Sequence, residues 1–179
     1  IRLMEKSVIS NAKRREPNKY NLPARAKRVA VIGAGLSGMG FAFRMASKKY
    51  QVTVFEKTDQ IGGSLKELMD EAAYMAEFEL QFKNEKYDLK LGCEIDDINK
   101  LCKDTDDDSE EGFDVIYIAT GKDGNTFGVP LPAQGSDEGA SAEKAGCMLV
   151  GATAVLIGGE VCGKDLMYAL ADGINMATS

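Results

Sequence analysis

The sequence predicts an α/β fold with a mostly parallel central sheet flanked by helices. Short apolar runs with strand character alternate along the chain with segments of helical periodicity. The first two of these runs are joined by a glycine-rich turn and a helix. The chain has 179 residues, of which 44% are hydrophobic, enough to bury one sizeable core. We therefore expect one compact domain with a sheet of about five strands.

The first segment, residues 1–27, mixes polar, basic and turn-forming side chains without a sustained helical or alternating period. We interpret it as an extended N-terminal arm. It is either a solvated lead-in or a strap that docks against a partner subunit, and the sequence leaves both open. The folded domain is expected to cover residues 28–179.

Residues 28–56 predict a complete βαβ unit. Val29–Ile32 is a short apolar strand, followed by the turn Gly33-Ala34-Gly35-Leu36-Ser37-Gly38 and an amphipathic helix that reaches about Ser47. Gln51–Phe55 has the pattern of a second buried strand.

The spacing of Gly33, Gly35 and Gly38 is typical of a dinucleotide-binding turn. Gly33 permits the tight turn, Gly35 admits the phosphates, and Gly38 lets helix and strand approach, while the helix N-terminus offers N–H donors to a pyrophosphate. Glu56, at the end of the second strand, can accept hydrogen bonds from ribose hydroxyls. This predicts a Rossmann-like fold without choosing between NAD and FAD; a glycine-rich turn with an incidental glutamate is the alternative. The predicted site residues here are Gly33, Gly35, Leu36, Ser37, Gly38, Glu56 and Lys57.

The middle of the chain continues the alternation. Lys66 to about Phe82 has mostly helical apolar spacing, and Leu89–Leu91 with Glu94-Ile95 suggests a return to the sheet. The acidic run at residues 104–111 is best interpreted as a solvated loop, because its spacing matches no calcium loop. Phe113–Ile118 is a buried-type strand.

The last part of the chain predicts a connection, one more strand and a helix. Residues 122–151 are rich in Gly, Ala, Ser and Pro and break every period, as a flexible connection does. Ala154–Ile157 is the final predicted strand, and a helix follows from about Asp165 to Ala177. The nucleotide site is then expected to come from residues 28–121 and 152–179.

From Arg28 to Leu65 the chain resembles the FAD-binding half of the pyridine-nucleotide-disulfide oxidoreductase superfamily, particularly relatives of the glutamate synthase small subunit. The resemblance rests on the glycine turn together with Gly62-Gly63-Ser64-Leu65, a glycine pair placed shortly after the acidic residue. In that family these glycines bring the chain against the ribityl and pyrophosphate region of the flavin. The resemblance therefore implies FAD as the cofactor, with a generic Gly-Gly turn as the alternative.

Further matches follow in the order of that family. Leu91–Ile95 resembles a third-strand segment whose last residue, Ile95 here, lies against adenine. Ala119-Thr120-Gly121 resembles the strand-end A-T-G motif, for which closure of a strand by small residues is the structural alternative.

Residues 157–161 resemble the second flavin motif of the family. There an acidic residue that follows a glycine contacts the ribityl chain, which assigns Gly159 and Glu160 to the site. The family normally has Asp where Glu160 stands, and the extra methylene puts the position of this contact in doubt. The next helix points its N-terminus towards the isoalloxazine, with Leu166 in its first turn.

One part of the family's architecture is missing. The family inserts a second nucleotide domain, for NAD(P)H, between the A-T-G strand and the closing flavin motif. Only 36 residues separate Gly121 from Gly158, and they contain no second glycine fingerprint. This implies either a natural flavin subunit that exchanges electrons with another protein or a chain from which the nicotinamide domain was removed.

Composition narrows the classes of function. A net charge of −6 argues against a nucleic-acid partner. No run approaches the ~18 apolar residues of a membrane span, and the start of the chain lacks a signal-peptide pattern, so we expect no membrane partner and a cytoplasmic location. The four cysteines lie far apart, with no C-x-x-C pair, and the chain has no histidine. A metal centre, a cysteine-pair redox site and a His-dependent triad are therefore not expected.

Flavin is then the only redox group that the sequence predicts. We expect an FAD-dependent oxidoreductase subunit that relays electrons between a partner redox protein and another acceptor, with no side chain as catalytic acid, base or nucleophile. The alternatives are direct oxidation of NAD(P)H by an exposed flavin, and a redox-silent nucleotide-binding module in a larger assembly.

Overall fold

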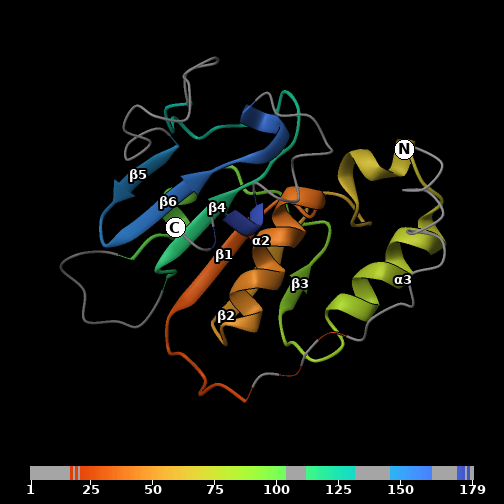
Figure 1. Ribbon diagram of the computed structural model, residues 1–179. Coiled ribbons are helices and arrows are strands. Elements are labelled where there is room, and N and C mark those ends of the chain that lie inside the picture. The colour runs from red at the N-terminus through yellow and green to blue at the C-terminus, as the bar shows by residue number, and fades with distance from the viewer. Residues whose placement is uncertain are drawn as a thin grey trace, which may run out of the picture.

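The computed structural model describes residues 17, 19, 21–103, 112–131, 146–162, 173–175 and 177. Its centre is a six-stranded sheet with the strand order β3-β2-β1-β4-β6-β5 (Figure 1). All neighbouring strands are parallel except β5, which is antiparallel to β6. The prediction of an α/β fold with a mostly parallel sheet is confirmed. The strands are β1 Arg28–Ile32, β2 Gln51–Phe55, β3 Asp88–Lys90, β4 Val115–Ile118, β5 Cys147–Val150 and β6 Thr153–Ile157.

The chain places strands on one side of β1 first and on its other side later. The chain passes from β1 through helix α2, Leu36–Ser47, to β2 and then outward to β3. It returns to the other side of β1 as β4. In a parallel sheet this reversal leaves a crevice beyond the carboxyl ends of the two strands on either side of it. The fold thus places a groove at the ends of β1 and β4.

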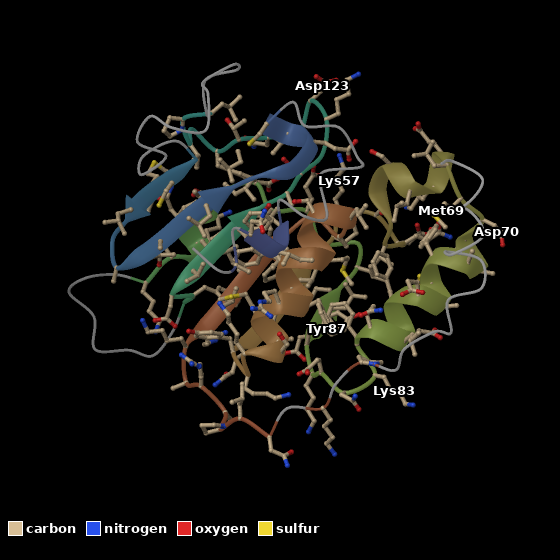
Figure 2. All side chains as sticks on the ribbon, viewed as in Figure 1. Lys57, Met69, Asp70, Lys83, Tyr87 and Asp123 are labelled. Atoms are coloured by element: carbon tan, nitrogen blue, oxygen red, sulfur yellow. The ribbon has the colours of Figure 1, made fainter. Side chains whose placement is uncertain are left out.

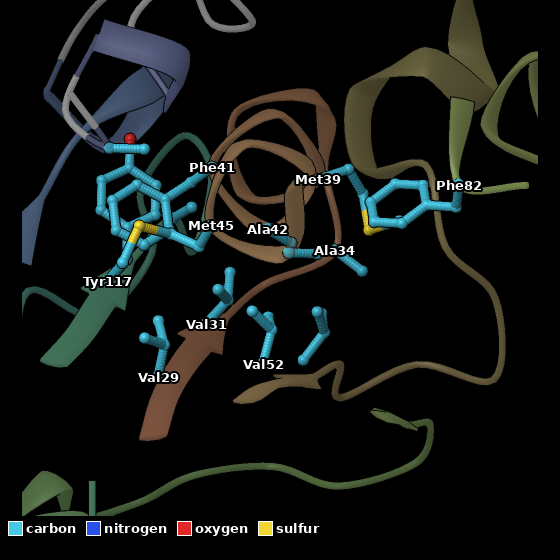
Figure 3. Packing of buried hydrophobic residues seen from close by; sticks show 14 of the residues in the cluster. Val29, Val31, Ala34, Met39, Phe41, Ala42, Met45, Val52, Phe82 and Tyr117 are labelled. Atoms are coloured by element: carbon cyan, nitrogen blue, oxygen red, sulfur yellow. The ribbon is translucent and has the colours of Figure 1, made fainter. Parts of the chain in front are cut away.

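Helix α2 covers one face of the sheet. Alternate residues of β1 and β4 point to this face, so that Val29, Val31 and Tyr117 pack against Phe41 and Met45 of the helix (Figure 3). The Phe41 and Tyr117 rings are stacked with centroids 4.1 Å apart. This period of two in the strands and of three to four in the helix is the pattern that the sequence predicted.

The opposite face is covered by irregular segments rather than by a long helix among the described residues. Ala30, Ile32, Ile116 and Ile118, the other alternate positions of β1 and β4, are buried there. They pack with residues of the segment 93–102, which includes the short helix η2 Ile98–Leu101, and with Phe127 and Val129.

The predicted helix from Lys66 to Phe82 is interrupted. The structure has a 3-10 helix η1, Gly63–Glu67, and an α-helix α3, Glu71–Gln81, with Asp70 extended between them. Leu68 is 69% exposed, so the apolar residue that seemed to continue the helical face does not pack in the core. Instead α3 is anchored by buried Tyr74, whose hydroxyl donates to the carbonyl oxygen of Ile61 at 3.2 Å.

Two strand predictions also need correction. Leu89 and Lys90 lie in strand β3, as predicted, but the strand ends at Lys90. Residues 91–95 form a turn with Gly92 at φ +63° and are not in a strand, although the Cys93 N–H still donates to the Glu56 carbonyl at 2.9 Å. At the other edge, β5 lies inside the segment predicted to be a flexible connection. This edge strand is only four residues long and alternates exposed positions, such as Leu149 at 76%, with the half-buried Met148 and Val150.

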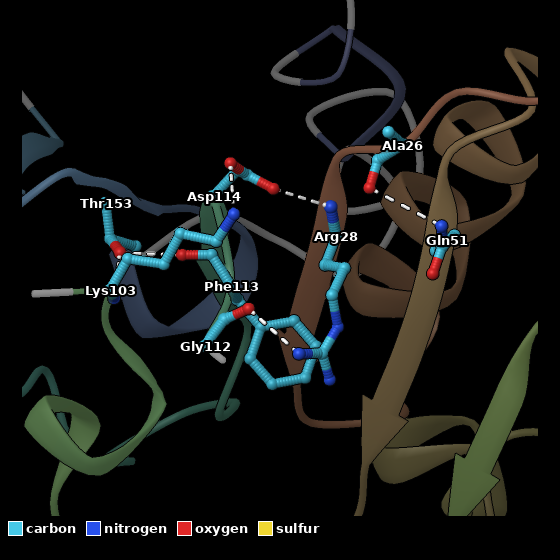
Figure 4. Close-up of polar contacts among 8 residues, drawn as sticks. All are labelled: Ala26, Arg28, Gln51, Lys103, Gly112, Phe113, Asp114 and Thr153. Atoms are coloured by element: carbon cyan, nitrogen blue, oxygen red, sulfur yellow. Dashed lines mark hydrogen bonds and ion pairs between the residues drawn. The ribbon is translucent and has the colours of Figure 1, made fainter. Parts of the chain in front are cut away.

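A polar network joins the amino ends of β1 and β4 (Figure 4). The Asp114 carboxylate accepts from the Arg28 backbone N–H at 2.7 Å and from Lys103 Nζ at 3.0 Å. Thr153 Oγ1 donates to the Phe113 carbonyl at 2.6 Å and accepts from the Lys103 backbone N–H at 2.8 Å. This end of the sheet therefore carries a structural network, remote from the groove.

Several predicted segments fall wholly or partly outside the described residues. These are most of the N-terminal arm, the acidic run, residues 132–145 of the connection, and the predicted last helix apart from residues 173–175 and 177. Residues 173–175 are helical. Among the helices that the structure describes, none combines the length and the hydropathy that a membrane-spanning segment needs.

Candidate dinucleotide-binding site

The glycine turn connects the carboxyl end of β1 to the N-terminus of α2. The Gly33 N–H donates to the Phe55 carbonyl at 2.8 Å, which ties the turn to the end of β2. Gly35 occupies the N-cap position, so no side chain caps the helix, and its first turn contains no acidic residue. The first backbone N–H groups of an α-helix have no partners within the helix. This helix end is therefore suited to an anion.

The three glycine positions of the turn differ in whether the fold requires glycine there. A Cβ on Gly33 would lie 2.2 Å from the Ala119 carbonyl oxygen, and one on Gly38 would lie 1.9 Å from the Gly33 carbonyl oxygen. Gly33 also has a φ of +102°. Both glycines are therefore required by the fold itself.

Gly35 has no such requirement. Its φ of −78° suits any residue, and apart from its neighbours along the chain the nearest described atom to a Cβ placed there is the Gly63 Cα, at 3.9 Å. The space beside Gly35 belongs to the larger of two neighbouring cavities, about 710 Å³ in volume. A glycine that neither backbone nor packing demands, at an uncapped helix end, fits a site where a ligand approaches the main chain.

Glu56 follows β2, and its side chain is buried beside the turn. Its Oε2 accepts from the Ala34 N–H at 2.8 Å, and its Oε1 accepts from the Thr58 N–H at 3.0 Å and the Thr58 hydroxyl at 2.9 Å. A carboxylate has about four acceptor positions and these bonds occupy three, so about one is left for a hydroxyl group of a ligand. Glu56 thus also has a structural role, since it fixes the shape of the glycine turn. This role was not predicted from the sequence.

The glycine pair packs against the turn. Gly62 donates its N–H to the Ala34 carbonyl at 2.8 Å, and a Cβ on it would lie 2.9 Å from the Tyr74 ring. A Cβ on Gly63 would lie 3.0 Å from the Gly35 Cα. Gly63 therefore lines the cavity beside Gly35, and Gly62 ties this segment to the turn. Leu65 is buried beneath it and does not line the groove.

The predicted second motif lies at the end of β6, in the 3-10 helix η3, Gly159–Cys162. Gly159 has a φ of +79°, and a Cβ on it would lie 2.6 Å from the Ser37 side chain. The Glu160 carboxylate accepts from the Ser64 hydroxyl. This places the second motif on the first turn of α2, next to the glycine pair.

The strand-end motif of β4 forms the groove's central wall. Ala119 is buried against Gly33, and the Thr120 hydroxyl donates to the Asn125 carbonyl at 2.9 Å. Gly121 has a φ of +83°, which favours glycine. These residues line the larger cavity, as do Lys57 and Glu160.

A second cavity of about 230 Å³ continues the groove past Glu56. The two cavities share Gly33, Glu56, Lys57 and Thr120. Ile95, the residue predicted to lie against adenine, lines the smaller cavity, although it follows a turn instead of lying in a strand. Its apolar walls also include Ile32, Phe55 and Phe127.

The structure brings together most of the predicted site residues around one groove. Gly38, Gly62, Leu65 and Gly159 line neither cavity and act through packing instead. Leu166 lies outside the described residues.

Several lining residues were not predicted. Lys122 and Asp123 follow the A-T-G motif directly, which was a usable signal. Ile32 and Phe55 were predicted only as strand residues. No local pattern marked the others, which are Thr58, Lys66, Glu67, Leu68, Cys93, Glu94, Asp96, Gly124, Asn125 and Phe127.

The larger cavity is lined by both basic and acidic side chains. Lys57, Lys66 and Lys122 line it, and the Lys66 ammonium donates to the Gln60 carbonyl at 3.1 Å. Lys57 and Asp123 extend from the upper part of the domain in Figure 2. The same cavity is also lined by the carboxylates of Glu56, Glu67, Asp123 and Glu160, so its charge is mixed. No cluster of three metal-ligating side chains occurs within the described ranges.

The strands, the helices and the glycine turn together form an α/β fold of the Rossmann-like kind. Residues 31–82, from β1 through α2 and β2 to the end of α3, match the family described as an NAD(P)-binding Rossmann-like domain. This match covers less than a third of the chain and agrees with the Rossmann-like fold of the sheet and helices.

The curated relatives match within short segments. A 4,4'-diapophytoene desaturase of Staphylococcus haemolyticus is 51% identical over 37 residues, 21% of this chain and 7% of the relative. Protoporphyrinogen oxidase 2 of Arabidopsis thaliana is 49% identical over 43 residues, 24% of this chain and 8% of the relative. The matched segments thus cover less than a tenth of the length of these relatives.

Two solved structures are similar over longer stretches. A 2-naphthoyl-CoA reductase is 36% identical, with a TM-score of 0.41, over 55% of this chain and 15% of that one. A flavoprotein disulfide reductase of Escherichia coli is 16% identical, with a TM-score of 0.41, over 86% of this chain and 36% of that one.

Proposed function

We propose that this chain binds FAD in the groove and serves as the flavin domain or subunit of an oxidoreductase that relays electrons to or from a partner redox protein. The observation that carries the proposal is the space beside Gly35, at an uncapped helix N-terminus. The pyrophosphate would lie there, with the adenosine extending past Glu56 towards Ile95.

The far side of the groove favours FAD over NAD in this proposal. Beyond Gly35 the larger cavity runs past Gly63 and Ser64 to Glu160, where a hydroxyl donor meets a carboxylate. The same residues carry the resemblance to glutamate synthase small-subunit-like proteins. Gly63, Ser64 and Glu160 would hold the ribityl side of the cofactor, and bound FAD would supply the redox chemistry. The chain's own residues would bind and orient it.

The proposed FAD domain spans residues 28–179. Its site is built from residues 28–121 and 152–179, and the segment 122–151 connects them where an NAD(P)H domain would otherwise be inserted. Part of this connection, Cys147–Val150, is strand β5. Because no such domain is inserted at this place, the flavin would exchange electrons with another protein. The sequence-based expectation of a cytoplasmic location is part of the same proposal.

The test is an absorbance spectrum of the purified protein, followed by identification of any released cofactor by mass. Flavin bands and released FAD, or stoichiometric uptake of added FAD, would support the cofactor assignment. A colourless protein that takes up no FAD would refute it.

The electron relay requires a separate test. Photoreduced protein should pass electrons anaerobically to a protein acceptor such as cytochrome c, whereas NADPH alone should leave the flavin oxidised. Bleaching by NADPH without a partner would favour a direct NAD(P)H reductase, and a bound flavin that cannot be reduced would favour a structural nucleotide-binding module.

A further inference from the structure

The side chains of Ser64 and Glu160 meet beside the groove. Ser64 Oγ lies 3.0 Å from Glu160 Oε1 and 2.9 Å from Oε2, and it donates to the carboxylate. Ser64 belongs to η1, directly after the glycine pair, and Glu160 belongs to η3, directly after Gly159. Both residues line the larger cavity. One contact therefore joins two stretches of chain on the same side of the groove.

This contact orients the carboxylate without saturating it. A serine hydroxyl has a single hydrogen, which Ser64 shares between the two oxygens of Glu160, whereas a carboxylate offers about four acceptor positions. Most of the acceptor capacity of Glu160 is therefore left for hydroxyl groups of a ligand. The Ser64 oxygen also keeps its lone pairs as acceptors.

The backbone of Glu160 is held separately from its side chain. Gly159 lies against Ser37, where a Cβ would come within 2.6 Å of the serine side chain, so the main chain is fixed on the first turn of α2. The glutamate side chain nevertheless has several rotatable bonds, and ordering it costs conformational entropy. A partner that orders it before the ligand arrives lowers the cost of binding.

We propose that Ser64 is a positioning residue that holds the Glu160 carboxylate ready for the hydroxyl groups of the ribityl chain. The inference rests on the proposed binding of FAD. It also gives the longer side chain of Glu160 a defined place, since Ser64 restricts the freedom that the extra methylene adds.

The test compares FAD with ADP, which shares the adenosine and pyrophosphate but lacks the ribityl chain. Affinities are measured by calorimetric titration of the purified full chain. S64A should lower the affinity for FAD about tenfold, the size expected for one hydrogen bond to a charged group. The affinity for ADP should change by no more than about twofold. S64T should restore FAD binding, because it keeps the hydroxyl.

Two further variants make the test specific. E160A should lower the affinity for FAD. Adding S64A to E160A should lower that affinity little further, because the two residues act through one contact. S47A is the matched control: Ser47 Oγ donates to the Arg44 carbonyl at the far end of α2, so its removal should leave both affinities unchanged. Circular dichroism checks that each variant is folded. If S64A does not fold, the affinity of E160A for FAD is the measurement that tests the inference.

The outcomes separate the inference from the proposed function. Unchanged FAD binding in S64A or E160A, or equal weakening of FAD and ADP by S64A, overturns the role of Ser64 while FAD binding stands. Failure of the unmodified protein to bind FAD overturns the proposed function and the inference with it. The inference is supported if S64A loses affinity for FAD but not for ADP, while S64T and S47A keep the affinity of the unmodified protein for FAD.

Discussion

The hydroxyl oxygens of Ser37 and Tyr117 lie 2.8 Å apart in the buried core. This hydrogen bond joins the first turn of α2 to strand β4, which follows much later in the chain. Ser37 lines the groove, whereas Tyr117 is fully buried and lines neither cavity. The position of the helix N-terminus therefore depends on a residue that has no access to a ligand.

Replacing Tyr117 with phenylalanine should therefore destabilise the fold. Y117F keeps the stack on Phe41 but removes the hydroxyl, and we expect a loss of about 1 kcal/mol in urea unfolding. Y50F is the matched control, because the Tyr50 hydroxyl accepts from Arg25 at an exposed position. Equal losses in the two variants would contradict the importance of the buried bond.

The glycines of the turn should separate folding from binding. G35A should fold with a loss of no more than about 1 kcal/mol, since alanine is only a poorer N-cap, yet it should bind ADP at least about tenfold more weakly. G33A should lose about 2 kcal/mol or more, because its φ of +102° and the Ala119 carbonyl both oppose a Cβ. Thermal unfolding and ADP titration measure the two effects. Normal ADP binding by folded G35A would remove the main support for the proposed site.

Thr153 offers a prediction away from the groove. T153V keeps the shape of the side chain but leaves the Lys103 N–H and the Phe113 carbonyl without the hydroxyl that joins them. We expect a loss of about 1–3 kcal/mol in urea unfolding and unchanged ADP affinity. T153S, which keeps the hydroxyl, should lose less. A larger loss in T153S would show that the methyl group, and not the network, matters here.

The Asp114 network predicts a dependence of stability on pH. Burial by itself would raise the pKa of Asp114, but the hydrogen bond from the Arg28 N–H and the ammonium of Lys103 outweigh it and lower that pKa. The carboxylate then contributes stability that is present above the ordinary Asp pKa of about 3.9 and is lost as the pH falls through the folded-state pKa.

D114N should consequently be less stable than the unmodified protein at pH 7, and the difference should shrink as the pH is lowered below about 4. Urea unfolding at several pH values measures it. D59N, which changes an exposed carboxylate in the turn after β2, is the control for a general effect of charge. A difference between D114N and the unmodified protein that persists unchanged to about pH 2 would contradict this account.

The βαβ unit was predictable because its signals are local. Strand β1, helix α2 and strand β2 each carry their period within a few residues. Gly38 is demanded by a contact inside the unit, and Gly33 by its own backbone conformation. The strands β4 and β6 are equally clear, since both are apolar runs within the sheet.

The parts that the sequence did not predict depend on distant neighbours. Leu149 is exposed although it lies in a strand, and Leu68 is exposed although it continues a helical pattern. The second partner of Glu56, Thr58, lies two residues away but has no distinctive pattern. Phe127 reaches the groove from the predicted connection only because β4 lies next to β1.

The place of β4 beside β1 also bears on how the chain is assembled during synthesis. Strand β1 pairs with β2 soon after it is made, but its other edge pairs with residues 115–118. At roughly 5–20 residues per second, a ribosome needs several seconds to reach them. During that interval the edge of β1 can pair with other chains. The segment with the recognisable glycine turn is thus the one that most needs protection in the nascent protein.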